Sequence, residues 1–267
     1  MNQNITIRAS AWGGLFDCAH RFEWTTLMKR SKPAGLRALL GTAIHASTAV
    51  FDKARLEGAP VTADEAADAF IETLVRPDFD VDFSQDDLSL REAHRIGLTL
   101  HSLYCAEIAP GFDFIDVETA LDPLVIDCGA GVTVTLTGTM DRARAASTDT
   151  GIVIPDVKTG SRVIEKGLAN TRGRSAQLGA YQLMFENTKQ VPTEGAQIIA
   201  LATTSAPTAA VSQIFDARRV MVGTDDQPGL IQYAADQFRT GHFPPNPQSV
   251  LCSKRYCARW DNCIFHE

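Results

Sequence analysis

The 267-residue chain lacks several features that would assign it to a particular class of protein. No stretch approaches the roughly 18 to 20 apolar residues of a membrane span, and the opening residues MNQNITIRAS lack the basic-then-apolar order of a signal peptide. The net charge of -7 argues against a generally basic nucleic-acid coat, although a local basic groove can exist in an acidic chain. Internal repeats and low-complexity segments are also missing. We therefore expect a cytoplasmic protein that makes no membrane contact.

The residues that are present predict a mixed α/β fold. Hydrophobic residues make up 45% of the chain, which is enough for a substantial core. We expect one domain over residues 1–267. Its successive parts would be a mainly helical part at 1–110, a sheet core at 111–216, a C-terminal helix and linker at 217–247, and a cysteine-rich tail at 248–267.

The period of the hydrophobic residues changes along the chain. In the first part apolar residues recur at helical spacing, which predicts helices at Leu15–Met28, Leu39–Leu56, Ala63–Leu74 and Leu88–Ile108. Further along, alternating runs separated by turn residues such as STDTG at 147–151 predict strands at 112–121, 124–129, 132–138 and 151–160. The remaining pattern predicts helices at Ser175–Asn187 and Gly229–Arg239, with strands between them at Ala196–Thr203 and Val211–Asp216.

Three cysteines crowd into the tail LCSKRYCARWDNCIFHE with the spacing C-x4-C-x5-C: Cys252, Cys257 and Cys263. Disulfides are disfavoured in a cytoplasmic chain, so a metal ion or an iron–sulfur cluster explains the close thiols better, and both usually take four ligands. Cys18, in FDCAHRFEW, is the best candidate for the fourth ligand, with His20 or His266 as alternatives. Cys105 and Cys128 stand alone and are expected to be buried, inert thiols.

The segment IPDVKTG, at 154–160, places an aspartate and a lysine two residues apart at the end of an apolar run. Alternate residues of a strand point the same way, so Asp156 and Lys158 should share one face while Val157 points into the opposite layer. Most pairs of this kind are solvated surface pairs. The interpretation therefore depends on which other residues converge on this position.

Three carboxylates follow one another along the predicted sheet. Glu118 lies in the strand DVETAL, Asp141 is expected in a turn within LTGTMDRAR, and Asp156 lies in the segment just described. Acids gathered from three strands make an oxygen-rich pocket suited to Mg²⁺ or Mn²⁺, and a neighbouring lysine can stabilise charge during attack on a phosphodiester. A different strand register would substitute Asp116 or Asp122 for Glu118.

Three further residues fit the same site, and each has an ordinary alternative role. His45, in GTAIHAS, could supply a nitrogen ligand or a phosphate contact, or could be a satisfied core histidine. Gln177 and Tyr181, in SAQLGAYQLMF, are four residues apart on a predicted helix, so they share a face that could meet a nucleic-acid strand. Taken singly, the glutamine could be a solvated residue and the tyrosine part of the core.

A local excess of positive charge follows the predicted active strand. The segment SRVIEKGLANTRGRSAQ has a single acid, Glu165, against four bases: Arg162, Lys166, Arg172 and Arg174. A nucleic-acid strand passing a metal site would need such a lining, but a solvated charged loop is an equally good interpretation of the segment by itself.

Together these motifs resemble the PD-(D/E)xK nuclease superfamily, and within it the RecB-like branch with an iron–sulfur staple, to which Cas4 and the AddB nuclease domain belong. The resemblance rests on the histidine of GTAIHAS, the aspartate of GTMD, the D-x-K element of PDVKTG, the Q-x3-Y helix of QLGAY, and one early cysteine with three late ones. Order and spacing match over about the whole chain. In members of that branch, two of the late cysteines usually lie closer together than the x4 gap here.

The resemblance implies a restriction-endonuclease-like core, with a central mixed sheet flanked by helices, and metal-dependent cleavage of DNA, commonly exonucleolytic on single strands or ends. It implies that Mg²⁺ or Mn²⁺ is held by His45, Asp141, Asp156 and the backbone carbonyl of Val157. It assigns Glu118, Lys158, Gln177 and Tyr181, with the two aspartates, to catalysis. It also implies a [4Fe–4S] cluster on Cys18, Cys252, Cys257 and Cys263, with Zn²⁺ as the alternative.

No helicase motif is found, so we expect a stand-alone nuclease of recombination, repair or phage and mobile-element DNA processing, with DNA and a recombinase or helicase as partners. Two alternatives are a DNA-binding or assembly module that keeps the fold without cutting, and a zinc-stapled regulatory protein whose acids are surface charge. The first would be favoured by the loss of one acid of the triad, and all three are present.

Overall fold

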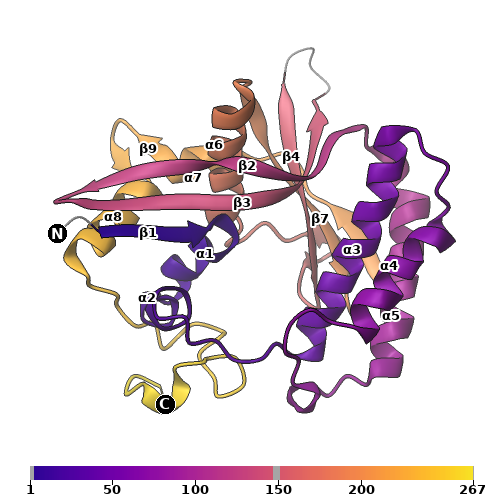
Figure 1. Ribbon diagram of the computed structural model, residues 1–267, viewed down its shortest axis with the longest axis horizontal. Helices are drawn as coiled ribbons and strands as arrows, with labels where there is room; N and C mark the ends of the chain where they lie inside the picture. The colour runs from indigo at the N-terminus through magenta and orange to yellow at the C-terminus, as the bar shows by residue number, and fades with distance from the viewer. Residues whose placement is uncertain (1–2, 147–150, 267) are drawn as a thin grey trace.

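A computed structural model describes residues 3–146 and 151–266 and shows the predicted mixed α/β architecture (Figure 1). Among these residues, one mixed sheet is built from six strands in the order β1-β3-β4-β7-β8, with β2 paired to β3. The strands are β1 (Gln3–Arg8), β2 (Phe114–Gly129), β3 (Val132–Ala145), β4 (Ile152–Gly160), β7 (Thr193–Ala202) and β8 (Thr208–Val211). The pairs β1–β3 and β4–β7 are parallel, and β2–β3, β3–β4 and β7–β8 are antiparallel.

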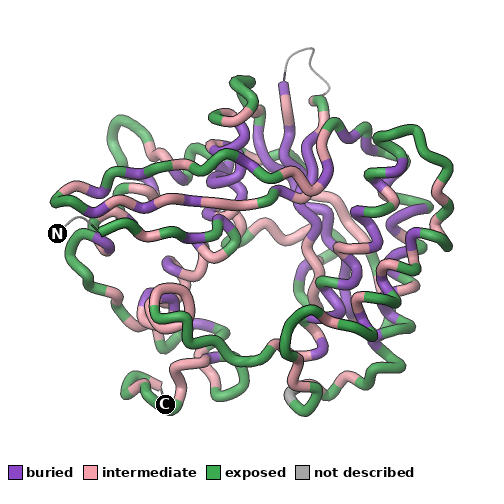
Figure 2. Tube along the Cα trace, viewed as in Figure 1, coloured by how far each residue is buried: buried purple, intermediate pink, exposed green. Residues whose placement is uncertain are grey.

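Helices pack on both faces of the sheet and create two hydrophobic cores. The first core includes Trp12 and Phe238, and its helices are α1 (Ala9–Asp17), α2 (Ala19–Phe22), α6 (Ser175–Lys189), α7 (Ala217–Val222) and α8 (Leu230–Thr240). The second core includes Leu40 and Phe70, and its helices are α3 (Leu36–Glu57), α4 (Ala63–Val75) and α5 (Leu90–Leu103). Figure 2 shows the buried residues concentrated along the central strands and on the facing sides of the helices.

The central strands β4 and β7 contribute to both cores. Ile154 and Ile198 belong to the first core, whereas Val157 and Ile199 belong to the second. Such two-sided burial explains why these strands are nearly continuous apolar runs. The catalytic candidates on β4 therefore lie where the two cores meet.

Several predicted elements are confirmed, and others are corrected. The helices predicted at 39–56, 63–74, 175–187 and 229–239 correspond closely to α3, α4, α6 and α8. The helix predicted at 88–108 is α5 followed by a wider helical turn at Tyr104–Ile108. Part of the predicted STDTG turn, residues 147–150, lies outside the described residues.

The front of the chain differs most from the prediction. Its first element is the strand β1, and the helix predicted at Leu15–Met28 is instead α1, α2 and a wider turn at Glu23–Leu27. Cys18 separates α1 from α2 because its backbone is extended, with φ -151° and ψ 98°. Helical periodicity could not reveal this break, because Cys18 leaves the helix for a tertiary contact described below.

In the sheet, the strands predicted at 112–121 and 124–129 form one strand, β2, with a register shift between Leu121 and Leu124. The intervening Pro123 is tolerated because β2 pairs only with β3 and so is an edge strand. The strand predicted at Val211–Asp216 is wrong: β8 ends at Val211, and only an isolated bridge joins Phe215 to Ala196. None of the described helices combines the length and the apolar character that crossing a bilayer requires.

Candidate active site

The D-x-K segment forms the end of β4, with the geometry expected from strand alternation. Asp156 is buried, with 1% of its surface exposed, and its Oδ2 atom makes an ion pair with Lys158 Nζ. Its Oδ1 atom is buried and has no hydrogen-bond partner among the described residues. Burial raises the pKa of Asp156, and the charge of Lys158 opposes that rise. This arrangement leaves one carboxylate oxygen available to a ligand.

Asp141 lies within strand β3 and not in a turn, which corrects the prediction for LTGTMDRAR. Gly138 serves packing rather than turning, because a Cβ there would lie 2.9 Å from Tyr181 Cε1. The Val157 N–H donates to Asp141 Oδ2 at 3.0 Å, and His45 Nδ1 lies 3.4 Å from the same oxygen. Burial alone would raise the pKa of Asp141, but His45 and the neighbouring cations, together with this N–H, hold it below its ordinary value.

Glu118 lies on β2 directly across from Asp141, because the flanking residues pair Val117 with Arg142 and Thr119 with Met140. Its φ of 51° is in the left-handed region, which is uncommon for a residue other than glycine and marks a locally strained backbone. Burial, and then the negative charge of Asp141, raise the pKa of Glu118.

The competing acids are placed elsewhere. Asp116 makes an ion pair with Lys189 at 3.0 Å, and the backbone N–H of Asp122 bonds to Thr188. The register therefore favours Glu118 over both of these alternatives at the site.

His45 reaches the site from α3, which lies close to β4. A Cβ at Gly41 would lie 2.6 Å from Thr159 Oγ1, so the glycine of GTAIHAS permits the predicted close approach. One ligand atom from each of His45, Glu118 and Asp141 can be chosen so that all three lie within 4.8 Å of one another. A nitrogen and two carboxylates are a donor set that Mg²⁺ or Mn²⁺ accepts, and the unpartnered oxygen of Asp156 fits the same purpose.

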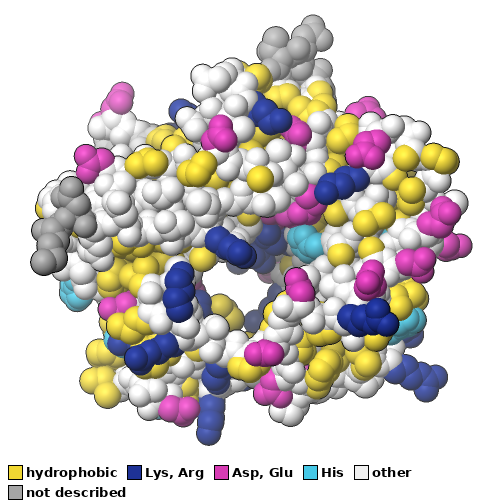
Figure 3. Space-filling view, in the orientation of Figure 1, with side chains coloured by type: hydrophobic (Ala, Val, Ile, Leu, Met, Phe, Trp, Pro, Cys, Tyr) yellow, Lys and Arg dark blue, Asp and Glu magenta, His cyan; other side chains and the backbone are white. Residues whose placement is uncertain are grey.

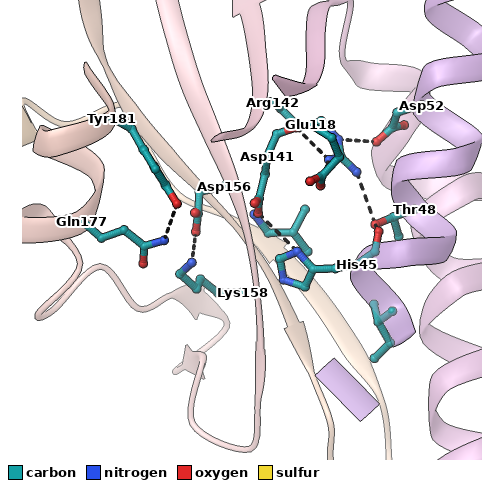
Figure 4. Close-up of polar contacts among 12 residues, drawn as sticks. His45, Thr48, Asp52, Glu118, Asp141, Arg142, Asp156, Lys158, Gln177 and Tyr181 are labelled. Atoms are coloured by element: carbon teal, nitrogen blue, oxygen red, sulfur yellow. Dashed lines mark hydrogen bonds and ion pairs between the residues drawn. The ribbon is translucent and has the colours of Figure 1, made fainter. Parts of the chain in front are cut away.

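Gln177 and Tyr181 of α6 lie on the side of the Asp156–Lys158 pair that faces away from Asp141 and His45 (Figure 4). Gln177 Nε2 donates to the Tyr181 hydroxyl at 3.4 Å, so the two predicted helix residues do share a face. Burial raises the pKa of Tyr181 to about 12. The roles assigned to these residues, to Asp156 as a metal ligand and to the Val157 carbonyl remain predictions.

A buried polar network behind the metal-ligand group was not anticipated from the sequence. Arg142, Asp52 and Thr48 are buried, Arg142 donates to both Asp52 and Thr48, and Tyr104 donates to Asp52. A signal was present, because His45, Thr48 and Asp52 are spaced three and four residues apart on one helix face.

The predicted basic residues divide into two groups. Arg172 and Arg174 line a groove of about 800 Å³ that also includes Gln177, residues of α1 and Leu251 of the tail. The Nε atom of Arg174 is buried there without a hydrogen-bond partner in the described part of the chain. Arg162 and Lys166 are exposed on the segment between β4 and α6, outside this groove.

The four predicted cysteine ligands come together from the two ends of the chain. Cys18, Cys252, Cys257 and Cys263 line one pocket, and the Asn246 N–H donates to Cys18 Sγ at 3.4 Å. Burial, and then the charges of the other three thiolates, raise the pKa of Cys252. A set of four thiol donors fits either an iron–sulfur cluster or Zn²⁺.

The alternative ligands and the remaining cysteines are also placed. His20 lines the same pocket and lies edge-on against Phe265, whereas His266 stacks on Trp260 with ring centroids 3.9 Å apart. Cys105 and Cys128 are buried, as predicted, and burial raises the pKa of both thiols.

Comparison with known proteins places the chain in a family. The chain is similar in fold to a protein from Eubacterium rectale described as a candidate exonuclease, with a TM-score of 0.54, 12% identity, and coverage of 94% of this chain and 87% of that chain. A second solved structure, SSO0001, gives a TM-score of 0.45 at 14% identity over 97% of this chain and 85% of the other. No curated protein sequence matches. The family profile described as the PD-(D/E)XK nuclease superfamily matches residues 9–264, and the chain therefore belongs to that superfamily.

Proposed function

We propose that the protein is a metal-dependent deoxyribonuclease that hydrolyses phosphodiester bonds with Mg²⁺ or Mn²⁺. The observation that carries the proposal is the convergence of the Asp156–Lys158 pair with the ligand group of His45, Glu118 and Asp141 at the junction of the two cores. Asp156 and Lys158 have the D-x-K spacing for which the superfamily of this chain is named, and Asp141 precedes them on β3. The chain itself thus offers a candidate residue for each role that the proposed hydrolysis assigns to the protein.

The side chains divide the chemistry among them. His45, Glu118, Asp141 and Asp156 would hold the metal, which when bound supplies a Lewis acid and a water made more acidic. Lys158, held beside Asp156, places its ammonium where it offsets the charge that develops on the phosphate oxygens. The Val157 N–H fixes the orientation of the Asp141 carboxylate. Gln177 and Tyr181 act together from α6 as a contact for the substrate strand.

We further propose that the enzyme is an exonuclease acting on single-stranded DNA or DNA ends. In support, Figure 3 shows this face of the molecule hollowed at its centre, with several Lys and Arg side chains around the hollow. The groove lined by Arg172, Arg174 and Gln177 brings positive charge beside a candidate catalytic residue. A basic groove in an acidic chain is expected where a phosphate backbone binds.

The cysteine pocket supports assignment to the RecB-like, Cas4-like branch with a [4Fe–4S] cluster, with Zn²⁺ as the alternative. Its role in the proposal is mechanical, because four protein thiolates leave no open coordination position for chemistry. Recombination, repair or phage DNA processing, with a recombinase or helicase as partner, is the pathway we propose for the nuclease. A zinc-stapled regulatory protein is disfavoured because the acids are gathered at one partly buried site, with Asp156 itself buried, and are not spread over the surface.

The test is degradation of end-labelled single- and double-stranded DNA with Mg²⁺, with Mn²⁺ or with EDTA. The expected result is metal-dependent shortening from an end by the wild type and its loss in Asp141→Asn. Asp113→Asn removes an exposed acid just before β2 and is the matched control, which should keep full activity. Binding of DNA without any metal-dependent cleavage would instead identify a non-cutting module of the same fold.

A further inference from the structure

Arg142 is a charged side chain with no exposed surface, and it lies directly behind the candidate metal ligands (Figure 4). A buried guanidinium is costly unless its donors are used. Here its Nε donates to Asp52 Oδ2 at 2.7 Å, and its Nη2 donates to Thr48 Oγ1 at 3.4 Å. Its Nη1 donates to the Asp141 carbonyl at 2.8 Å and to Glu118 Oε1 at 3.2 Å.

The hydrogen bond from Arg142 opposes two effects that disfavour the observed position of the Glu118 carboxylate. The Glu118 backbone is in the left-handed region, and its carboxylate faces that of Asp141 across the β2–β3 pair. Among the described residues, no side chain other than Arg142 donates a hydrogen bond to this carboxylate. Within the described part of the chain, this contact engages one oxygen of Glu118 and leaves the other to face a metal.

The same arginine joins three of the four elements that supply the proposed ligands. It contacts α3 through Thr48 and Asp52, β2 through Glu118, and its own strand β3 at the Asp141 carbonyl. His45 lies on the face of α3 that also carries the two α3 contacts. Asp52 is fixed in turn by the Tyr104 hydroxyl, which donates to its Oδ2 at 2.5 Å.

We infer that Arg142 is a positioning residue, which sets Glu118 relative to His45 and Asp141 and thereby determines the affinity of the site for a divalent cation. Asp52 and Tyr104 hold the arginine in that orientation. The inference rests on the proposed function, because it concerns the same metal site. A purely structural role would change stability without changing the metal affinity of the folded protein.

The experiment measures Mn²⁺ binding by calorimetry in the absence of DNA, together with thermal unfolding of each variant. Manganese is the probe because it prefers oxygen and nitrogen ligands to the thiols of the cysteine pocket. Arg142→Gln should weaken Mn²⁺ binding by about 10- to 100-fold, the range typical when an outer partner of a metal ligand is removed. Arg142→Lys should bind Mn²⁺ more tightly than Arg142→Gln but more weakly than the wild type, since lysine restores the positive charge but not the several N–H donors of the planar guanidinium.

A double variant separates action through Glu118 from other effects. If Arg142 works by placing Glu118, Arg142→Gln combined with Glu118→Gln should bind Mn²⁺ no more weakly than Glu118→Gln alone. Additive losses would overturn the inference, as would unchanged Mn²⁺ binding in folded Arg142→Gln. Should the arginine variants not fold, Tyr104→Phe removes only a supporting hydroxyl and must still weaken Mn²⁺ binding for the inference to stand.

Ser47→Ala is the matched control. Ser47 is a buried polar residue of the same helix, and its hydroxyl donates to the Ile44 carbonyl, at 3.1 Å. It should change thermal stability and leave Mn²⁺ affinity unaltered. Asp141→Asn distinguishes this inference from the proposed function. If Asp141→Asn binds Mn²⁺ with wild-type affinity, the proposed metal site is wrong. If Asp141→Asn loses Mn²⁺ affinity and the Arg142 variants do not, only the positioning role of Arg142 is rejected.

Discussion

The acid site and the cysteine pocket are both built from residues distant in sequence, but they are held in different ways. At the acid site, the strand register and a buried network place each side chain, and Asp156 and Arg142 are almost completely buried. The tail around the cysteines has little regular structure, and Val250 and Ile264 are 79% and 89% exposed. The acid site is therefore preformed by the core, whereas we expect the order of the cysteine tail to depend on a bound metal or cluster.

The contacts of the tail illustrate this difference. Asn246 and Ser249 bond to Asp17, Arg259 bonds to Glu23, and Arg255 makes an ion pair with Asp86. Partly exposed polar contacts of this kind each contribute little to stability. Four thiolates bound to a cluster or to zinc would supply the larger part, as metals do in small metal-dependent segments.

The substitution with the largest expected effect disrupts the acid site and leaves the cysteine tail intact. Lys158→Met should lower the cleavage rate by roughly 10²- to 10³-fold, the loss typical when a charge that stabilises a transition state is removed. Single-turnover rates on end-labelled single-stranded DNA measure this loss. The metal content of the cysteine pocket should equal that of the wild type. A folded Lys158→Met protein with wild-type rate would show that the D-x-K pair is not catalytic.

The substitution with the next largest expected effect disrupts the cysteine tail and leaves the acid site intact. Cys18→Ser should remove most of the bound iron and acid-labile sulfide, or the zinc, and expose residues after Pro247 to protease, with a partial and indirect loss of activity. Cys128→Ser, at a buried thiol outside the pocket, is the control and should keep full metal content. Full wild-type content in Cys18→Ser prepared without oxygen would contradict the joining of the two ends.

A smaller effect concerns the groove that lies between the two regions. Arg172→Gln combined with Arg174→Gln should weaken DNA binding and reduce the slope of log K against log salt by about 1.4, because each phosphate that a basic side chain neutralises on a single strand contributes roughly 0.7. Arg76→Gln combined with Arg91→Gln, at exposed positions of the helical part, should leave the slope unchanged. An equal slope in both double variants would mean that the strand runs elsewhere.

The smallest effect belongs to neither region. Hydrogen bonds from the Ser89 side chain and backbone lower the pKa of Glu92 in the capping box that begins α5. A lowered folded-state pKa contributes stability above the unfolded value, near 4.5, and the contribution disappears as pH falls through the folded value. Ser89→Ala should therefore lower the melting temperature slightly at pH 7 and less at pH 4, with cleavage rate and metal content unchanged. A difference that grows on acidification would contradict this assignment.

Some parts of the site could be predicted because they depend on neighbours in the chain. The two-residue period of a strand is enough to put Asp156 and Lys158 on one face, and the helical period is enough to pair Gln177 with Tyr181. The same local rules located α3, α4, α6 and α8. Periodicity could not show that Asp141 lies in a strand, because Gly138 resembles a turn residue until its contact with Tyr181 is seen.

By itself, the sequence determined the order of the motifs, the main helices and the central strands, since each follows from local hydrophobic period and residue type. The tertiary structure decided three other features. Cross-strand register placed Glu118, and not Asp116, opposite Asp141, with a left-handed backbone. The packing of α3 on the sheet buried Arg142 against Asp52, and the meeting of the two ends broke the first helix at Cys18. Each depends on contacts between residues far apart in the chain, which no local pattern encodes.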